Sequence, residues 1–193
     1  MDDRELINLY LDGGDISAFN ALVRKQQKPI FNFILKMVGN REDAADLSQQ
    51  VFIRCFKSLR RLKDRSRFAP WLYRIAVNSV HDHYRRRKEV YSLDDDSVNA
   101  GLRENLTDGG VMPSEYAEAS QRAELVKAAL KRIPEEQREV VILKIYQGLK
   151  FTEIAEALDT PLNTVKSRLY YGMNAIKKIF KEMKLKEFSH DEL

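Results

Sequence analysis

Apolar residues recur at three- and four-residue steps along most of the chain, which is the period of an amphipathic α-helix. No stretch alternates apolar and polar residues convincingly with the two-residue period of a strand. The clearest apolar stripe begins near Arg41 and gives that helix one buried face. Its members are Ala44, Leu47, Val51, Cys55 and Leu59. The pattern therefore predicts an all-α protein.

Three more helices are predicted in the first half of the chain. A short one ends at Gly13-Gly14, and a long one at about 16–38 ends at Gly39-Asn40. Glycine suits such ends because it readily adopts the left-handed conformation of a helix C-cap. The last of the three begins near Pro70, which a first helical turn tolerates, and becomes basic at 85–88. Its expected buried residues are Trp71, Leu72, Ile75, Ala76 and Val80.

The helical pattern stops between about Glu89 and Pro113, where glycines and scattered acids predict a partly disordered linker. It resumes at Ser114 with a helix that Pro134 ends, and the following helix closes at Gly148. That following helix is expected to bury Val140, Val141, Leu143 and Ile145. The predicted organisation is an N-terminal helical domain (1–88), an acidic linker (89–113) and a C-terminal helical domain (114–193).

The segment FTEIAEALDTPLNTVKSRLYYG, residues 151–172, has the pattern of a helix-turn-helix. Thr152 is predicted to cap its first helix, and Asp159-Thr160 to form the turn. Thr160 also caps the second helix, at about 161–184, with Pro161 in its first position. In such motifs the second helix enters the DNA major groove and presents its N-terminal residues to base edges.

The exposed polar and aromatic side chains of that second helix are the candidate DNA contacts. They are Asn163, Thr164, Lys166, Ser167, Arg168, Tyr170 and Tyr171. Amide, hydroxyl and guanidinium groups can read bases, and lysine and arginine can also bind phosphates. The alternative is a plain helical hairpin with a solvated cationic face.

The N-terminal domain carries a dense basic run between Arg54 and Lys88, with aromatic residues among the cations. Cations that follow a backbone, together with aromatic rings that stack on unpaired bases, are typical of single-strand binding. The alternative is that the aromatic rings, Phe68 and Trp71 in particular, belong to the core. A separate acidic-amide patch includes Asp43, Asp46, Gln49 and Gln50, with no basic run paired to it locally. This patch predicts either a protein-docking surface or ordinary solvated surface.

Charge is distributed unevenly along the 193 residues. The net charge is +4, but residues 89–118 alone carry −7, so the rest of the chain carries +11. A cationic body interrupted by an anionic segment favours a polyanionic partner such as nucleic acid. The single cysteine excludes an internal disulfide and fits a reducing cytoplasm, and no apolar run is long enough to span a membrane.

Two blocks of the sequence resemble one known family. Residues 46–88, with DLSQQVF and WLYRIAVN, resemble the N-terminal domain of extracytoplasmic-function (ECF) sigma factors and its DLxQExF and WLxxIAxN signatures. Residues 130–169, LKRIPEEQREVVILKIYQGLKFTEIAEALDTPLNTVKSRL, resemble the C-terminal domain of the same family. Both blocks occur in the family's order and spacing. The resemblance implies two helical domains and a promoter-recognition subunit of bacterial RNA polymerase.

The resemblance also implies roles for individual residues. Asp43, Asp46, Gln49 and Gln50 would dock on the polymerase core, and the candidate contacts of the second helix would read the −35 element as duplex. The −10 element would be melted by the 62–68 loop and the helix that follows. The residues expected there are Arg61, Lys63, Arg65, Arg67, Phe68, Arg74, Asn78, His81, Asp82 and Arg85. The acidic linker would occupy the RNA-exit channel of the polymerase. An anti-sigma factor, often membrane-bound in this family, would be a further partner, without insertion of this chain into the membrane.

Three positions depart from the family pattern. Gln50 replaces the usual acid, which is expected to alter core binding. Asp159 stands where glycine commonly makes the turn, although aspartate tolerates left-handed backbone better than most residues. Tyr171 stands where a basic residue is frequent, which is expected to change the −35 sequence that is read.

Other classes of function are less consistent with the residues. No phosphate-binding glycine loop or nucleophile signature is present, so the sequence predicts neither an enzyme nor a cofactor. No metal site is expected either, because His81 and His83, two apart on a helix, point to nearly opposite faces. The main rival is a helix-turn-helix regulator that is not a polymerase subunit; a third option is an interaction protein such as an anti-sigma factor.

Overall fold

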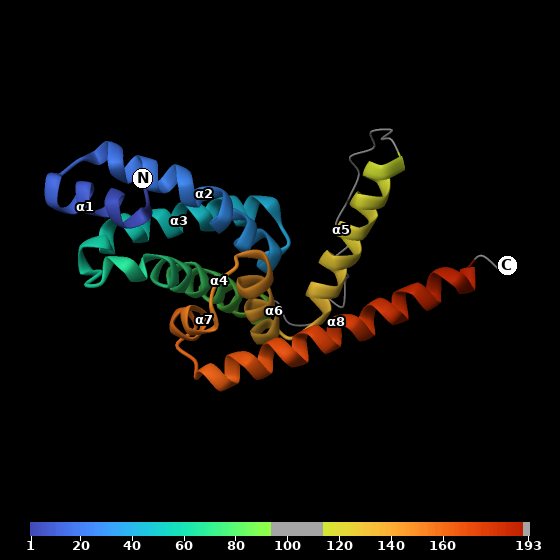
Figure 1. Ribbon diagram of the computed structural model, residues 1–193. Helices are drawn as coiled ribbons and strands as arrows, with labels where there is room; N and C mark the ends of the chain where they lie inside the picture. Colours follow the sequence, from blue (N-terminus) through green and yellow to red (C-terminus); the bar gives the residue numbers. More distant parts are fainter. Residues whose placement is uncertain (94–113, 191–193) are drawn as a thin grey trace.

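The computed structural model describes residues 1–93 and 114–190, and every element within them is helical (Figure 1). The helices are α1 (Asp3–Gly13), α2 (Ile16–Val38), α3 (Arg41–Ser58), α4 (Phe68–Leu93), α5 (Ser114–Arg132), α6 (Glu135–Val141), α7 (Phe151–Ala157) and α8 (Leu162–His190). Two short 3-10 turns connect α3 to α4, and a π-helical turn, Ile142–Tyr146, extends α6. The predicted all-α class is confirmed.

Local side chains define where the first helices begin and end. Side-chain oxygens of Asp2, Asp15 and Asn40 accept hydrogen bonds from backbone N–H groups at the starts of α1, α2 and α3. Gly14 (φ 70°) and Gly39 (φ 78°) adopt the left-handed conformation at the ends of α1 and α2. The predicted glycine caps are therefore present.

The N-terminal domain packs α1 to α4 around one core. The predicted stripe of α3, from Ala44 to Leu59, is buried throughout its apolar positions. It meets Phe33, Ile34 and Met37 of α2, and Leu72 of α4, all of which are fully or almost fully buried. Burial of this kind stabilises a fold by roughly 1.5–3 kcal/mol for each large aliphatic side chain. Trp71 and Ile75 are only partly buried, at the edge of this core.

The π-helical turn changes which residues of the C-terminal domain face inward. Val140, Val141 and Leu143 are buried as predicted, but Ile145 is 56% exposed. Ile142, which was not expected in the core, is fully buried instead. A π-helical turn adds a residue to the helical repeat, so it rotates the positions that follow it relative to an α-helix. The prediction for Ile145 is wrong for this reason.

The two domains pack against each other. In Figure 1, α7 lies beside α4, and α6 lies near the end of α2. Tyr73 of α4 donates a hydrogen bond to Gln147 (2.8 Å), and the ammonium of Lys36 lies 4.6 Å from the ring centre of Tyr146. The buried side chains of both domains form one contiguous cluster. We call the contact of α4 with α6 and α7 the interdomain seam.

The boundary of the linker differs from the prediction. Helix α4 continues to Leu93, so residues 89–93 are helical where the sequence predicted linker. The remainder of the predicted linker, 94–113, lies outside the described residues. Helix α8 likewise runs to His190 instead of ending near Lys184. None of the helices described here is long and apolar enough to cross a membrane.

Candidate nucleic-acid and protein interfaces

Helices α7 and α8 form the predicted helix-turn-helix. Asp159 in the turn has φ 50°, a left-handed conformation that few residues other than glycine adopt. The N–H of Thr160 donates to the carbonyl of Ala155 (3.0 Å), and this bond closes the turn. Val165, buried completely, anchors α8 against its neighbours. The turn therefore has the geometry that the sequence predicts.

The two threonine caps predicted for this motif are wrong. Helix α7 begins at Phe151, with Lys150 as its N-cap, so Thr152 lies inside the helix. The backbone N–H of Lys150 donates to the side chain of Glu153 (2.6 Å), which stabilises the helix start. The hydroxyl of Thr160 donates to the carbonyl of Leu158 (3.0 Å) instead of accepting from α8.

The predicted DNA contacts of α8 lie on one accessible face. Lys166, Ser167 and Asn163 are exposed, and Tyr170 and Tyr171 are 65% and 60% exposed. The two tyrosine rings lie 5.5 Å apart, edge to face. Large exposed aromatic rings beside cations are unusual on a surface without a partner. This face of α8 therefore presents amide, hydroxyl and ammonium groups together with two aromatic rings.

Two members of the α8 set are less accessible than the others. Thr164 is partly buried, and Arg168 makes an ion pair with Glu136 of α6 (2.7 Å). Because that glutamate is largely exposed, the ion pair leaves Arg168 able to exchange partners at small cost.

The N-terminal residues predicted to contact single-stranded DNA divide into groups. Arg61, Lys63 and Asn78 are exposed. Arg65 instead bridges to α1, where it binds Asp12 through two hydrogen bonds of 2.6 and 2.7 Å. The hydrogen bond from Arg65 lowers the pKa of Asp12. Arg65 therefore holds the 3-10 turn before α4 onto α1.

Phe68 does not belong to an accessible DNA-binding surface. Its side chain is 2% exposed, and its ring lies 6.0 Å from that of Trp71. The alternative reading of Phe68 as a core residue is therefore correct. A buried ring at the first position of α4 orients the basic loop that precedes it.

Three side chains of the same predicted set face the C-terminal domain. Arg67 pairs with Glu156 (3.3 Å) and Arg74 with Asp159 (3.1 Å) across the interdomain seam. His81 binds Glu139, and this hydrogen bond raises the pKa of the imidazole. Part of the predicted −10 surface thus contacts α6 and α7 while its side chains stay 48–62% exposed. Asp82, by contrast, is bound within its own domain, to Arg54 (3.2 Å) and Arg85 (3.0 Å).

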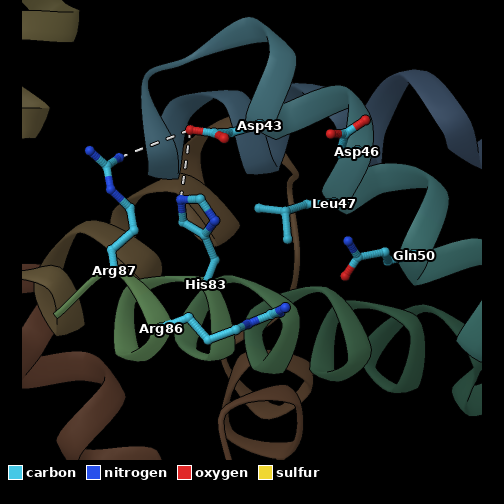
Figure 2. A pocket seen from close by; sticks show the side chains of 7 residues that line it. All are labelled: Asp43, Asp46, Leu47, Gln50, His83, Arg86 and Arg87. Atoms are coloured by element: carbon cyan, nitrogen blue, oxygen red, sulfur yellow. Dashed lines mark ion pairs between the residues drawn. The ribbon is translucent and has the colours of Figure 1, made fainter. Parts of the chain in front are cut away.

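The acidic-amide patch on α3 faces the basic end of α4 across a shallow pocket (Figure 2). Asp43 lies 3.7 Å from the Nε2 atom of His83 and 4.0 Å from Arg87. The expectation that this patch has no local basic partner is therefore wrong. The residues that line the pocket are Asp43, Asp46, Leu47, Gln50, His83, Arg86 and Arg87.

Gln49 lines a different groove, between α2 and α3. The groove is mostly apolar and includes Phe31, Phe52 and Ile53, of which Ile53 is 54% exposed. Sequence reasoning did not identify this surface. A signal was present, because Phe52 and Ile53 are apolar residues that fall outside the buried stripe of α3.

The chain matches two family descriptions in the order of its domains. Residues 22–90 match "Sigma-70 region 2", and residues 123–176 match "Sigma-70, region 4". Apart from residues 89 and 90, the predicted linker lies outside both matches, which together include the helix-turn-helix and the α3–α4 surfaces.

Relatives and solved structures agree with these matches. The ECF RNA polymerase sigma factor SigW of Bacillus subtilis is 30% identical over 88% of this chain and 92% of its own length. The ECF RNA polymerase sigma-E factor of Escherichia coli K12 is 31% identical over 84% and 86%. Of solved structures, CnrH in complex with the cytosolic domain of CnrY has TM-score 0.69 at 21% identity, covering 93% of this chain and 97% of that one. The sigma factor RpoE of Bartonella quintana, in complex with the anti-sigma factor NepR, has TM-score 0.67 at 20% identity, covering 86% and 98%. This chain belongs to the ECF family of RNA polymerase sigma factors.

Proposed function

We propose that this sigma factor reads the −35 element with α8 and melts the −10 element with the 62–68 loop and α4. As a family member it binds the RNA polymerase core and directs promoter-specific initiation. The observation that carries the residue-level proposal is the exposed face of α8, from Asn163 to Tyr171, on a helix-turn-helix scaffold. A conventional regulator that is not a polymerase subunit is not favoured, because both sigma domains are present.

The proposed core-binding surface is the face of α3 that carries Asp43, Asp46, Gln49 and Gln50. These residues lie beside an acidic-basic pocket on one side and an apolar groove on the other. A polar rim next to an exposed apolar strip is the usual composition of a protein interface. We propose that the polymerase clamp occupies this surface, with Ile53 contributing apolar area.

The proposed mechanism requires the two domains to separate. While Arg67 and Arg74 pair with Glu156 and Asp159, they face the C-terminal domain and not −10 DNA. On the polymerase, each domain would bind its own promoter element, and each contact would raise the effective concentration of the other. Binding one strand of the −10 element would then stabilise the open bubble. The acidic linker would lie in the RNA-exit channel.

We propose that the chain itself catalyses no reaction and acts in the cytoplasm at the nucleoid. An anti-sigma factor is the proposed negative regulator, and it would compete with the polymerase for the surfaces described above. One sigma factor of similar fold, RpoE of Bartonella quintana, has been solved in complex with the anti-sigma factor NepR.

Substitution of α8 tests the −35 assignment. At a promoter mapped with the wild-type protein, Lys166→Ala and Asn163→Ala should each lower initiation by about 5- to 150-fold. This range corresponds to the loss of one base contact that contributes about 1–3 kcal/mol. Lys178→Ala, an exposed lysine further along the same helix, is the matched control and should change initiation by less than about twofold. Equal loss in all three variants would contradict the assignment of the N-terminal part of α8 to the promoter.

A further inference from the structure

Three potential metal ligands meet at the interdomain seam. They are His81 of α4 and the two glutamates Glu135 and Glu139 of α6. The Nε2 atom of His81 lies 3.6 Å from Oε1 of Glu135 and within hydrogen-bonding distance of Glu139, and all three ligand atoms lie within 4.8 Å of one another. The two glutamates share a helix face because they are four residues apart. The fold therefore brings one imidazole and two carboxylates to one point.

Glu139 is the most informative member of this triad. It is only 3% exposed, and among the described residues its carboxylate has no hydrogen-bond partner other than His81. A carboxylate removed from water in this way costs free energy unless a counter-charge lies against it. Its neighbour Glu136 is already paired with Arg168, and Asp82 with Arg54 and Arg85. The triad thus holds two carboxylates against one imidazole, a surplus of negative charge at the buried end.

We propose that His81, Glu135 and Glu139 bind a divalent cation of the zinc class. Imidazole nitrogen and carboxylate oxygen are both ligand types that Zn²⁺ accepts, and three protein ligands leave a fourth position for water. Ligands of a tetrahedral zinc ion lie about 3.3 Å apart, which is close to the 3.6 Å separation of His81 and Glu135. His81 and Glu139 are in direct contact and would move apart to admit the ion. The half-exposed side chains of these two residues leave an open side for the water and an entry path. The ion would take the place of the proton shared by His81 and Glu139, and that proton would be released to solvent.

The site would couple metal binding to the arrangement of the domains. One ligand comes from the N-terminal domain and two from the C-terminal domain, so the full set exists only while the seam is closed. A ligand that binds only the closed form shifts the equilibrium towards it. This consequence rests on the proposed function: a bound ion would keep Arg67 and Arg74 away from −10 DNA and oppose initiation.

Isothermal titration of the full chain with Zn²⁺, without polymerase or DNA, tests the site. The wild type should bind one ion, and Glu135→Gln should weaken binding at least tenfold while leaving the contact of His81 with Glu139 in place. His81→Gln should weaken binding further. Glu136→Gln, the adjacent glutamate outside the triad, and His83→Gln, the neighbouring histidine, are matched controls that should bind as the wild type does.

Absence of saturable binding, or equal affinity in the wild type and Glu135→Gln, would overturn the proposal. Loss of binding in His83→Gln with retention in His81→Gln would also overturn it, because the ion would then sit at the pocket beside Asp43. Since no promoter or polymerase is present, this failure is distinct from failure of the sigma-factor function.

Discussion

At the scale of single residues, Asp159 adopts the left-handed conformation that the turn between α7 and α8 needs, a conformation for which glycine is the usual residue. Its φ of 50° lies in the left-handed region, where a side chain with a Cβ atom is strained. Aspartate is among the few residues that tolerate this conformation. The same side chain also pairs with Arg74, so it serves both the turn and the interdomain seam.

A pair of substitutions separates these two roles of Asp159. Both Asp159→Gly and Asp159→Ala delete the carboxylate, but only glycine relieves the backbone. We expect Asp159→Ala to be less stable than Asp159→Gly by about 1 kcal/mol in the free energy of unfolding, measured by urea denaturation. Equal stability of the two variants would show that the turn has relaxed out of the left-handed conformation.

At the scale of elements, the close packing of α8 against α6 depends on Gly172. A Cβ atom at this position would lie 3.0 Å from Cγ2 of Val141 and 3.3 Å from Cβ of Gln137. Both neighbours belong to α6, and Val141 is core, so neither side has free space. The glycine therefore sets how closely α8 approaches α6.

Replacement of this glycine by a branched residue should force the helices apart. We expect Gly172→Val to lower the free energy of unfolding by about 1–3 kcal/mol, the usual cost of an overpacked site. Thermal denaturation followed by circular dichroism would measure it. A variant as stable as the wild type would mean that α6 and α8 do not pack as described.

Regular periodicity made the N-terminal elements predictable, and irregular geometry limited the prediction elsewhere. The stripe of α3 follows one helical repeat from Ala44 to Leu59, so its buried face could be read from the sequence. Ile145 also falls at an apolar position of an α-helical repeat, but the π-helical turn moves it to the surface. Composition gives no signal for such a turn. Phe68 was ambiguous because an aromatic residue among cations fits a core and a DNA surface equally well.

At the scale of the whole molecule, the seam between the domains could not be predicted. The sequence separates Arg67 from Glu156 by almost ninety residues and a predicted linker, so their pairing is visible only in three dimensions. The sequence shows that Arg67 is positive and Glu156 negative, but it does not show that the two surfaces that carry them face each other. The residues of the candidate core-binding set, and those of the candidate −35 set, could be grouped from the sequence because each set lies within one helix.

Charge reversal on the C-terminal side of the seam should open the molecule without altering the residues proposed for −10 DNA. Glu156→Lys places two cations together, and we expect the closed form to lose about 0.2–1 kcal/mol, since the pair is partly exposed. Energy transfer between dyes on α3 and α8 would report this as a larger open fraction. Adding Arg67→Glu to Glu156→Lys should restore closure. Failure of the double variant to do so would exclude this ion pair as a determinant of closure.

Reconstituted run-off transcription tests the central claim most directly. Purified protein would be combined with bacterial core polymerase and DNA fragments from the genome that encodes it. Discrete start sites that appear only when this chain is added, each preceded by shared −10 and −35 sequences, are the predicted result. Start sites that still require a housekeeping sigma factor would contradict the account, because the chain would then bind DNA without serving as the promoter-recognition subunit.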